Sequence, residues 1–150
     1  MQAVLCDADG EVSVSEVPKP TLNDGEVLIR IQQVQLSITE CQYLTGKSSL
    51  SRFSDRLSDG PAQLFGHEFC GVIQETGPEV DEFSKGDRVY APGKITCGKC
   101  SYCDTGYKEH CVNKETLGFQ RPGALAEYMT SPPEPLRLLS DSVSNAEGAA

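Results

Sequence analysis

The sequence predicts a small, mainly β protein, a mostly antiparallel barrel built from short strands. Three observations favour this class: short apolar or alternating runs dominate the first half of the chain, Gly and Pro residues separate these runs, and no repeat of solenoid length occurs. The 150 residues favour one domain. Hydrophobic residues make up 38% and charged residues 23%, which is typical of globular chains and not of coiled coils or disordered segments.

The first strands are expected close to the N-terminus. Residues 2–6 are apolar, residues 9–10 (Asp-Gly) are a tight-turn signal, and residues 11–17 alternate in polarity. Residues 26–36 form a longer strand candidate. Its apolar positions change parity near residues 32–33 (Gln-Gln), so we expect a β-bulge there.

A short helix is expected to begin at Ser37. Ser37 and Glu40 form a capping box, in which Ser37 is the N-cap and the Glu40 side chain reaches back to it. Gly46 is suited to end this helix. Residues 47–63 are rich in Ser, Asp and Gly, which favours a surface loop that can include a helical turn.

The second half of the chain contains further strand candidates and one last helix. The strands are expected at residues 69–76, 88–91 and 124–130. Residues 140–150 begin like a helix, with Ser144 or Asn145 as the cap.

Charge and hydropathy exclude several classes of partner. Lys and Arg number 13 and Asp and Glu 22, giving a net charge of −9, so the chain lacks the basic surface that binds nucleic acid or anionic membrane. No run approaches the ~18 apolar residues of a membrane span. The first residues have neither the basic nor the apolar region of a secretion signal, so we expect a cytoplasmic protein. The acidity fits an ordinary soluble surface or a halophilic source.

The seven cysteines are the most unusual feature of the composition. Their number is odd and no export signal is visible, so a secreted disulfide framework is a poor interpretation and metal binding a better one. Cys6 and Cys70 stand apart from the others and are expected to be small buried hydrophobes.

The remaining pattern, C-x2-C-x2-C-x7-C, is a strong metal signal. It consists of Cys97, Cys100, Cys103 and Cys111. Four thiolates satisfy a tetrahedral Zn²⁺ ion and leave no open position, which favours a structural site. Such an ion would order a lobe over residues 92–115 that is too poor in apolar residues to order itself. The alternatives are two disulfides, free thiols or an iron–sulfur cluster.

A second candidate site is the tripeptide Gly66-His67-Glu68, which lies just before a predicted strand. Its imidazole and carboxylate are both usable by a catalytic metal. Alone this is a weak signal, because a neighbouring His and Glu are more often an ordinary surface pair.

Together these motifs resemble the N-terminal GroES-like catalytic domain of zinc-containing medium-chain alcohol and polyol dehydrogenases. The resemblance rests, in order, on residues 65–73, residues 85–89, the four-cysteine lobe and residues 123–128. It implies a GroES-like, partly open β-barrel over residues 1–150, with short helices and a zinc-bound lobe over residues 92–115. It also implies that a nicotinamide-binding domain follows residue 150, so we expect a fragment that is inactive by itself and binds about one zinc.

The resemblance also implies a role for individual residues. His67 corresponds to a ligand of the catalytic zinc, and Glu68 to a second ligand or a group close to it. The four cysteines correspond to the ligands of the structural zinc. Thr39 matches the residue that passes the proton of the substrate hydroxyl. NAD or NADP, an alcohol or carbonyl substrate and a homo-oligomeric state are implied for the full-length parent.

The chain departs from the family at the start of the first helix. Ser37 stands where the family has its first zinc ligand, a cysteine, and a serine hydroxyl is a poor replacement near neutral pH. Ser37 is sufficiently explained as a helix N-cap, and Cys41 is a possible substitute ligand. Glu40 replaces an Asp that orients the ligand His, and Gln42 replaces a relay histidine.

Three functions therefore stay open. The first is the catalytic-domain portion of a zinc-type NAD(P)-dependent alcohol or polyol dehydrogenase. The second is a relative that lost the catalytic zinc, because Ser37 replaces the cysteine, and works as a zinc-independent reductase. The third is a non-enzymatic, zinc-stabilised barrel used as a binding module.

Overall fold

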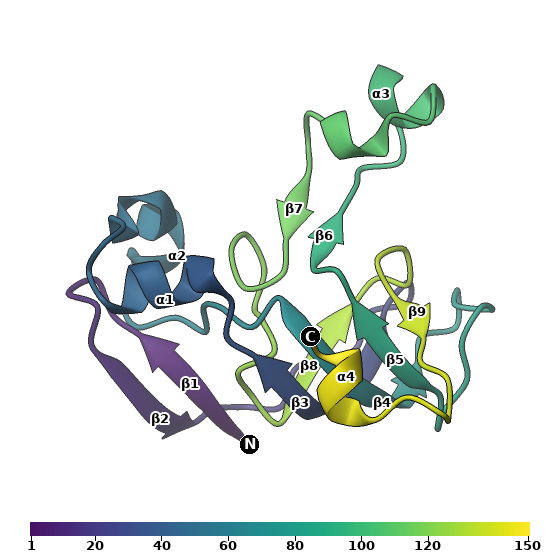
Figure 1. The fold of residues 1–150 in the computed structure, drawn as a ribbon, viewed down its shortest axis with the longest axis horizontal. Coiled ribbons are helices and arrows are strands. Elements are labelled where there is room, and N and C mark those ends of the chain that lie inside the picture. The colour runs from purple at the N-terminus through teal and green to yellow at the C-terminus, as the bar shows by residue number, and fades with distance from the viewer.

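A computed structural model describes all 150 residues, and Figure 1 shows their arrangement. The chain starts with an antiparallel hairpin of β1 (Gln2–Cys6) and β2 (Val12–Glu16). Its turn is stabilised by Asp7, whose carboxylate accepts hydrogen bonds from the backbone N–H groups of Asp9 and Glu11. Both predicted strands and the turn between them are confirmed.

The largest sheet has five antiparallel strands in the order β8-β3-β4-β5-β9. The strands are β3 (Val27–Gln35), β4 (Glu68–Thr76), β5 (Arg88–Ala91), β8 (Tyr128–Ser131) and β9 (Arg137–Leu138). The register between β3 and β4 shifts between Ile31 and Gln33, which confirms the predicted bulge. One core of twelve buried residues, including Val27, Ile29 and Phe69, packs around this sheet.

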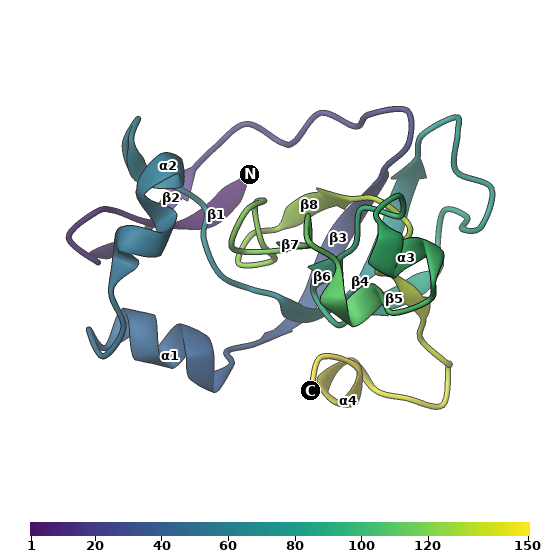
Figure 2. The same ribbon diagram turned by 90° about the horizontal axis from the view of Figure 1, so that it is seen from above.

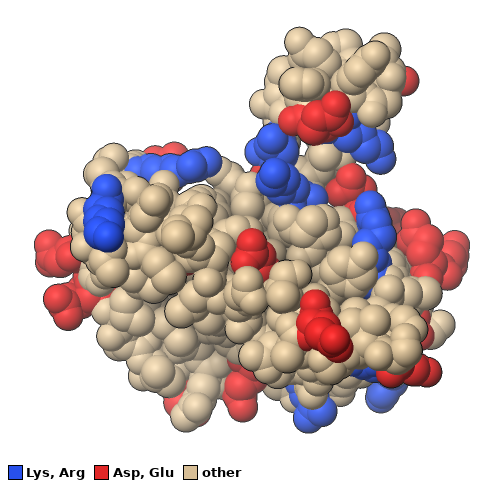
Figure 3. All heavy atoms as spheres, in the orientation of Figure 1, with Lys and Arg blue, Asp and Glu red and all other residues tan.

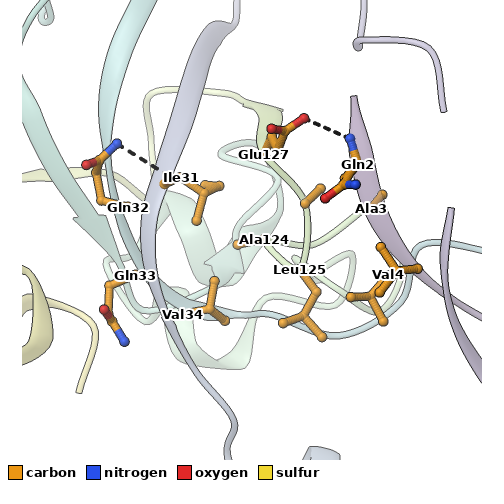
Figure 4. A pocket seen from close by; sticks show the side chains of 12 residues that line it. Gln2, Ala3, Val4, Ile31, Gln32, Gln33, Val34, Ala124, Leu125 and Glu127 are labelled. Carbon is orange, nitrogen blue, oxygen red and sulfur yellow. Dashed lines mark hydrogen bonds between the residues drawn. The ribbon is translucent and has the colours of Figure 1, made fainter. Parts of the chain in front are cut away.

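The sheets do not close into a complete barrel, as expected of a partly open one. The β1–β2 hairpin is a separate sheet, connected to the segment at residues 124–127 by backbone hydrogen bonds such as Val4 N–H to Leu125 O. Between the hairpin and β3 lies a largely apolar hollow of about 390 Å³ (Figure 4). Ile31 and Val34, on either side of the bulge, both point into it.

The helices are short. They are α1 (Ile38–Leu44), η1 (Leu50–Phe53), α2 (Ser54–Leu57), α3 (Ser101–Asp104), η2 (Lys108–His110) and α4 (Asn145–Gly148), where η marks a 3-10 helix. The capping box predicted at Ser37 and Glu40 is present, and α4 has a second one at Ser144 and Glu147. No helix has the length and apolar character needed to cross a membrane.

The cysteine-rich lobe projects from the body of the molecule. A two-stranded ribbon, β6 (Lys94–Ile95) paired with β7 (Glu115–Thr116), carries it, and α3 lies at its tip (Figures 1 and 2). The lobe and the α1–α2 segment stand on opposite sides of a notch in the molecular surface (Figure 3).

The strand predicted for residues 124–130 is wrong in its first half, because the regular strand begins only at Tyr128. The backbone of residues 124–127 bonds to several different segments: Ala124 N–H to Gly66 O, Leu125 O to Val4 N–H, and Glu127 N–H to Gln2 O. A segment whose partners change at each step does not form one continuous ladder.

Candidate functional site

His67 is held by a buried carboxylate from the first helix. Glu40 is completely buried, and its Oε1 lies 3.0 Å from Nδ1 of His67. The same oxygen accepts the backbone N–H of Gly66, and Oε2 accepts the N–H of Ser37 at 2.8 Å. One carboxylate therefore caps α1 and fixes the imidazole that follows it by 27 positions.

This hydrogen bond decides which imidazole nitrogen is available for chemistry. An ionised carboxylate accepts only, so Nδ1 carries the proton and the neutral ring presents its lone pair on Nε2. Burial acts to raise the pKa of Glu40, but hydrogen bonds from His67, Ser37 and Gly66 outweigh it and hold that pKa below its ordinary value. The pKa of His67 is raised, mainly by its hydrogen bond to Glu40.

The backbone before β4 turns so that His67 faces Glu40. Phe65 and Gly66 both have positive φ, 66° and 80°, and Phe65 is the only residue other than glycine with this conformation. A Cβ on Gly66 would lie 2.6 Å from the backbone nitrogen of Ala124, so only glycine fits there. Gly93 packs equally closely behind His67, where a Cβ would lie 2.8 Å from the His67 Cβ.

The two residues that the sequence proposes as ligands of the catalytic metal, His67 and Glu68, point their side chains toward each other. Nε2 of His67 lies 3.9 Å from Oε1 of Glu68, a spacing that fits two ligands of one zinc ion. The Ser37 hydroxyl accepts the Glu40 N–H at 3.2 Å and serves as the helix cap. Cys41 is exposed on α1 and does not join His67 and Glu68 in a three-ligand cluster.

Thr39, the predicted proton carrier, lies in the first turn of α1 between the cap residue Ser37 and Glu40. It is exposed, and its hydroxyl makes no hydrogen bond to the protein. Its role in proton transfer stays a prediction.

An aromatic wall that sequence reasoning missed encloses one side of His67. The ring of Phe119 meets the imidazole edge-on at a centroid distance of 5.6 Å. Phe119 also packs against Phe53 and Tyr43, and its carbonyl accepts a hydrogen bond from the half-buried Arg56 at 3.0 Å. Phe119 is 52 positions from His67, and no local pattern connects the two.

The four cysteines predicted to bind metal converge on one point. Their sulfurs all lie within 4.8 Å of one another, and no other group of three or more His, Cys, Asp or Glu side chains converges in this way. The Cys100–Cys103 and Cys97–Cys111 sulfur distances are both 3.5 Å. Disulfide sulfurs lie about 2.05 Å apart, whereas ligands about 2.3 Å from a tetrahedral ion are separated by roughly 3.8 Å. The donor set therefore fits a zinc ion, and all seven cysteines are free thiols.

The electrostatics of the cluster also suit a cation. Backbone N–H groups of Cys103 and Val112 lower the pKa of Cys100 to about 6 by hydrogen-bonding to its sulfur. Burial raises the pKa of Cys103 to about 11. Cys100 therefore loses its proton easily, whereas ionisation of the neighbouring Cys103 requires a nearby positive charge.

The ribbon below the lobe is anchored to the body on both of its strands. On the β6 side, Glu134 accepts hydrogen bonds from the Thr96 N–H and hydroxyl, at 3.3 and 2.7 Å. On the β7 side, Arg121 pairs with Glu115, and also with Glu26 at 2.9 Å. These contacts set the orientation of the lobe.

Comparisons with known proteins agree with this architecture. The family model described as the alcohol dehydrogenase GroES-like domain matches residues 23–141. An L-threonine 3-dehydrogenase of Bacillus velezensis is 33% identical over 120 residues, which are 80% of this chain and 33% of that protein. An L-threonine 3-dehydrogenase of Alteromonas mediterranea is 32% identical over 142 residues, 95% of this chain and 40% of that protein.

Solved structures show the same fold. The galactitol-1-phosphate dehydrogenase of Escherichia coli has a TM-score of 0.86 at 27% identity, covering 99% of this chain and 41% of that one. A putative zinc-binding dehydrogenase of Sinorhizobium meliloti, bound to NADP, has a TM-score of 0.82 at 27% identity, with 99% and 41% covered. The chain spans between a third and about two fifths of the length of these proteins. It belongs to the family of alcohol dehydrogenase GroES-like domains.

Proposed function

We propose that residues 1–150 are the GroES-like catalytic domain of a zinc-type, NAD(P)-dependent alcohol or polyol dehydrogenase. The full-length enzyme would move a hydride between an alcohol and nicotinamide, which a domain outside these residues would bind. The single observation that supports this most is the hydrogen-bonded pair of Glu40 and His67. Because the buried carboxylate holds Nδ1, the lone pair of Nε2 is free to bind a metal beside Glu68.

His67 and Glu68 are the residues of this chain that would hold the catalytic metal. A zinc ion bound there supplies a Lewis acid that lowers the pKa of the alcohol hydroxyl. Glu40 keeps the imidazole in one tautomer and one orientation. Phe119 excludes water from one side of the ring, and Thr39 offers an exposed hydroxyl for moving the proton outward.

The substrate class is proposed to be a small alcohol, polyol or the corresponding carbonyl compound. Its support is the naming of similar proteins as L-threonine 3-dehydrogenases and as a galactitol-1-phosphate dehydrogenase. The four-cysteine lobe over residues 92–115 is proposed to hold a structural zinc that takes no part in the reaction.

The proposal is tested with the full-length protein by metal analysis and by alcohol-dependent reduction of NAD⁺ or NADP⁺. We expect two zinc ions per chain, and loss of one ion and of activity in His67→Asn. His110→Asn is the matched control, because the only other histidine lies exposed on the lobe. Equal activity of both variants would contradict the proposal.

A second candidate, a zinc-independent reductase, is favoured by Ser37. Its hydroxyl is used as the cap of α1, and the chain assembles no third ligand beside His67 and Glu68. One zinc per chain with full reductase activity would select this candidate. Absence of any NAD(P)-dependent turnover and of cofactor binding would instead select a non-enzymatic barrel.

We also propose that the parent is a homo-oligomer in the cytoplasm. The seven free thiols support a reducing compartment. Light scattering of the purified parent and cell fractionation test the two statements separately.

A further inference from the structure

Two basic side chains that form no ion pair come from segments that contact His67 or its aromatic neighbour Phe119. Arg52, in η1, places its guanidinium 5.1 Å from the centroid of the Phe119 ring, and the edge of the His67 imidazole meets that same ring. Arg52 is exposed and has no hydrogen-bond or ion-pair partner in the protein. One aromatic ring therefore separates a free guanidinium from the imidazole.

The second basic residue is Lys94, the first residue of β6. It directly follows Gly93, whose α-carbon lies against the backbone and Cβ of His67. The Lys94 side chain is exposed and unpaired.

Arg52 and Lys94 lack an acidic partner although the chain has 22 Asp and Glu residues and a net charge of −9. Figure 3 shows basic side chains on the α1–α2 side and on the lobe side of the notch that separates these parts. Glu40 is fully buried and satisfied by four hydrogen-bonding groups, so the one partly exposed carboxylate beside His67 is Glu68. A metal ion held by Glu68 would neutralise that charge and leave the two cations uncompensated.

We propose that Arg52 and Lys94 form an oxyanion-recognition pair that selects alcohols carrying a carboxylate or phosphate group. This inference rests on the proposed function and names the substrate class of the same site. A planar guanidinium can bind either oxyanion through two N–H groups, and Lys adds a point charge. Phe119 would orient Arg52 by stacking, so the guanidinium is held in place before substrate arrives.

The experiment compares matched alcohols on the full-length enzyme: lactate beside isopropanol for the carboxylate, and glycerol phosphate beside glycerol for the phosphate. We expect the wild-type kcat/KM to favour the anionic member of at least one pair. Arg52→Gln and Lys94→Gln should each lower that preference by about tenfold to a hundredfold, mainly through KM. The pair that responds identifies the oxyanion.

Two further variants separate recognition from a structural role. Arg52→Lys should keep part of the preference, because it keeps the charge and loses the planar fork. Lys85→Gln removes one positive charge from the turn before β5, where the N–H of the next residue, Gly86, donates to Ile73 O, and it should leave the preference unchanged. An unchanged preference in both Arg52→Gln and Lys94→Gln, or a wild-type preference for the neutral alcohol in both pairs, would overturn the inference.

A binding measurement keeps the test independent of turnover. Calorimetric titration with inorganic phosphate should show binding to the wild type that weakens by about tenfold in Arg52→Gln and in Lys94→Gln. If no alcohol is oxidised but this pattern is found, the proposed function fails and the anion site stands. Equal phosphate binding by all variants would overturn the anion site, whatever the activity.

Discussion

The carboxylate of Glu40 lies 3.0 Å from Nδ1 of His67 and at the same time closes the capping box of α1. The same arrangement of Ser and Glu recurs at Ser144 and Glu147, where it is exposed and reaches no histidine. The molecule thus contains one capping box tied to the candidate site and one that serves its helix alone.

The first prediction uses this internal comparison. Glu40→Gln should lower the free energy of unfolding by about 2 kcal/mol, because the buried network loses its negative charge and one of its two accepting oxygens. It should also reduce zinc at the His67 site of the full-length protein. Glu147→Gln should have a much smaller effect on unfolding and none on zinc. Urea unfolding and metal analysis check both, and equal losses in the two variants would show that Glu40 does no more than cap its helix.

The second prediction concerns Ser37. Ser37→Cys should raise zinc occupancy of the His67 site, because it restores a thiolate at the position that aligns with the family's first zinc ligand. It should also cost about 1 kcal/mol of stability, because sulfur is a poor cap acceptor. Ser37→Ala loses the cap without offering a ligand, so it should show the stability cost and no gain in zinc. No difference in zinc between the two variants would count against the alignment of Ser37 with a family ligand.

The third prediction is a thiol count. In the zinc-loaded protein a thiol reagent should quickly modify only Cys41, which is exposed. Burial raises the pKa of Cys6 and of Cys70, so both should react slowly. A chelator should release four further fast thiols from the lobe, and denaturant should reveal all seven. Five fast thiols before chelation would contradict a closed metal site.

The fourth prediction concerns the segment before α4. The Arg88 guanidinium donates to the carbonyls of Ser140 and Val143 and to the Asn145 side chain, at 2.8 to 3.0 Å. Arg88→Ala should therefore release this segment, and hydrogen exchange at the amides of Gly148 and Ala149 should become at least about tenfold faster. Arg30→Ala, which removes an exposed arginine of β3, is the control. Unchanged exchange in Arg88→Ala would show that packing alone holds α4.

The sequence alone determined the features that depend on close spacing. Four cysteines within fifteen positions can meet only on one small lobe, a Ser and a Glu three residues apart cap the same helix turn, and a change of parity at residues 32–33 requires a bulge. The ordered motifs also identified the family that the comparisons show.

Only the tertiary structure decided what surrounds His67. Glu40, Gly93 and Phe119 reach it from separate segments, and Arg52 reaches it through Phe119. The strand expected from residue 124 begins at Tyr128 for the same reason, since its first residues bond to several different neighbours. Contacts between distant segments follow from the packing of the whole chain, which no local pattern of residue types records.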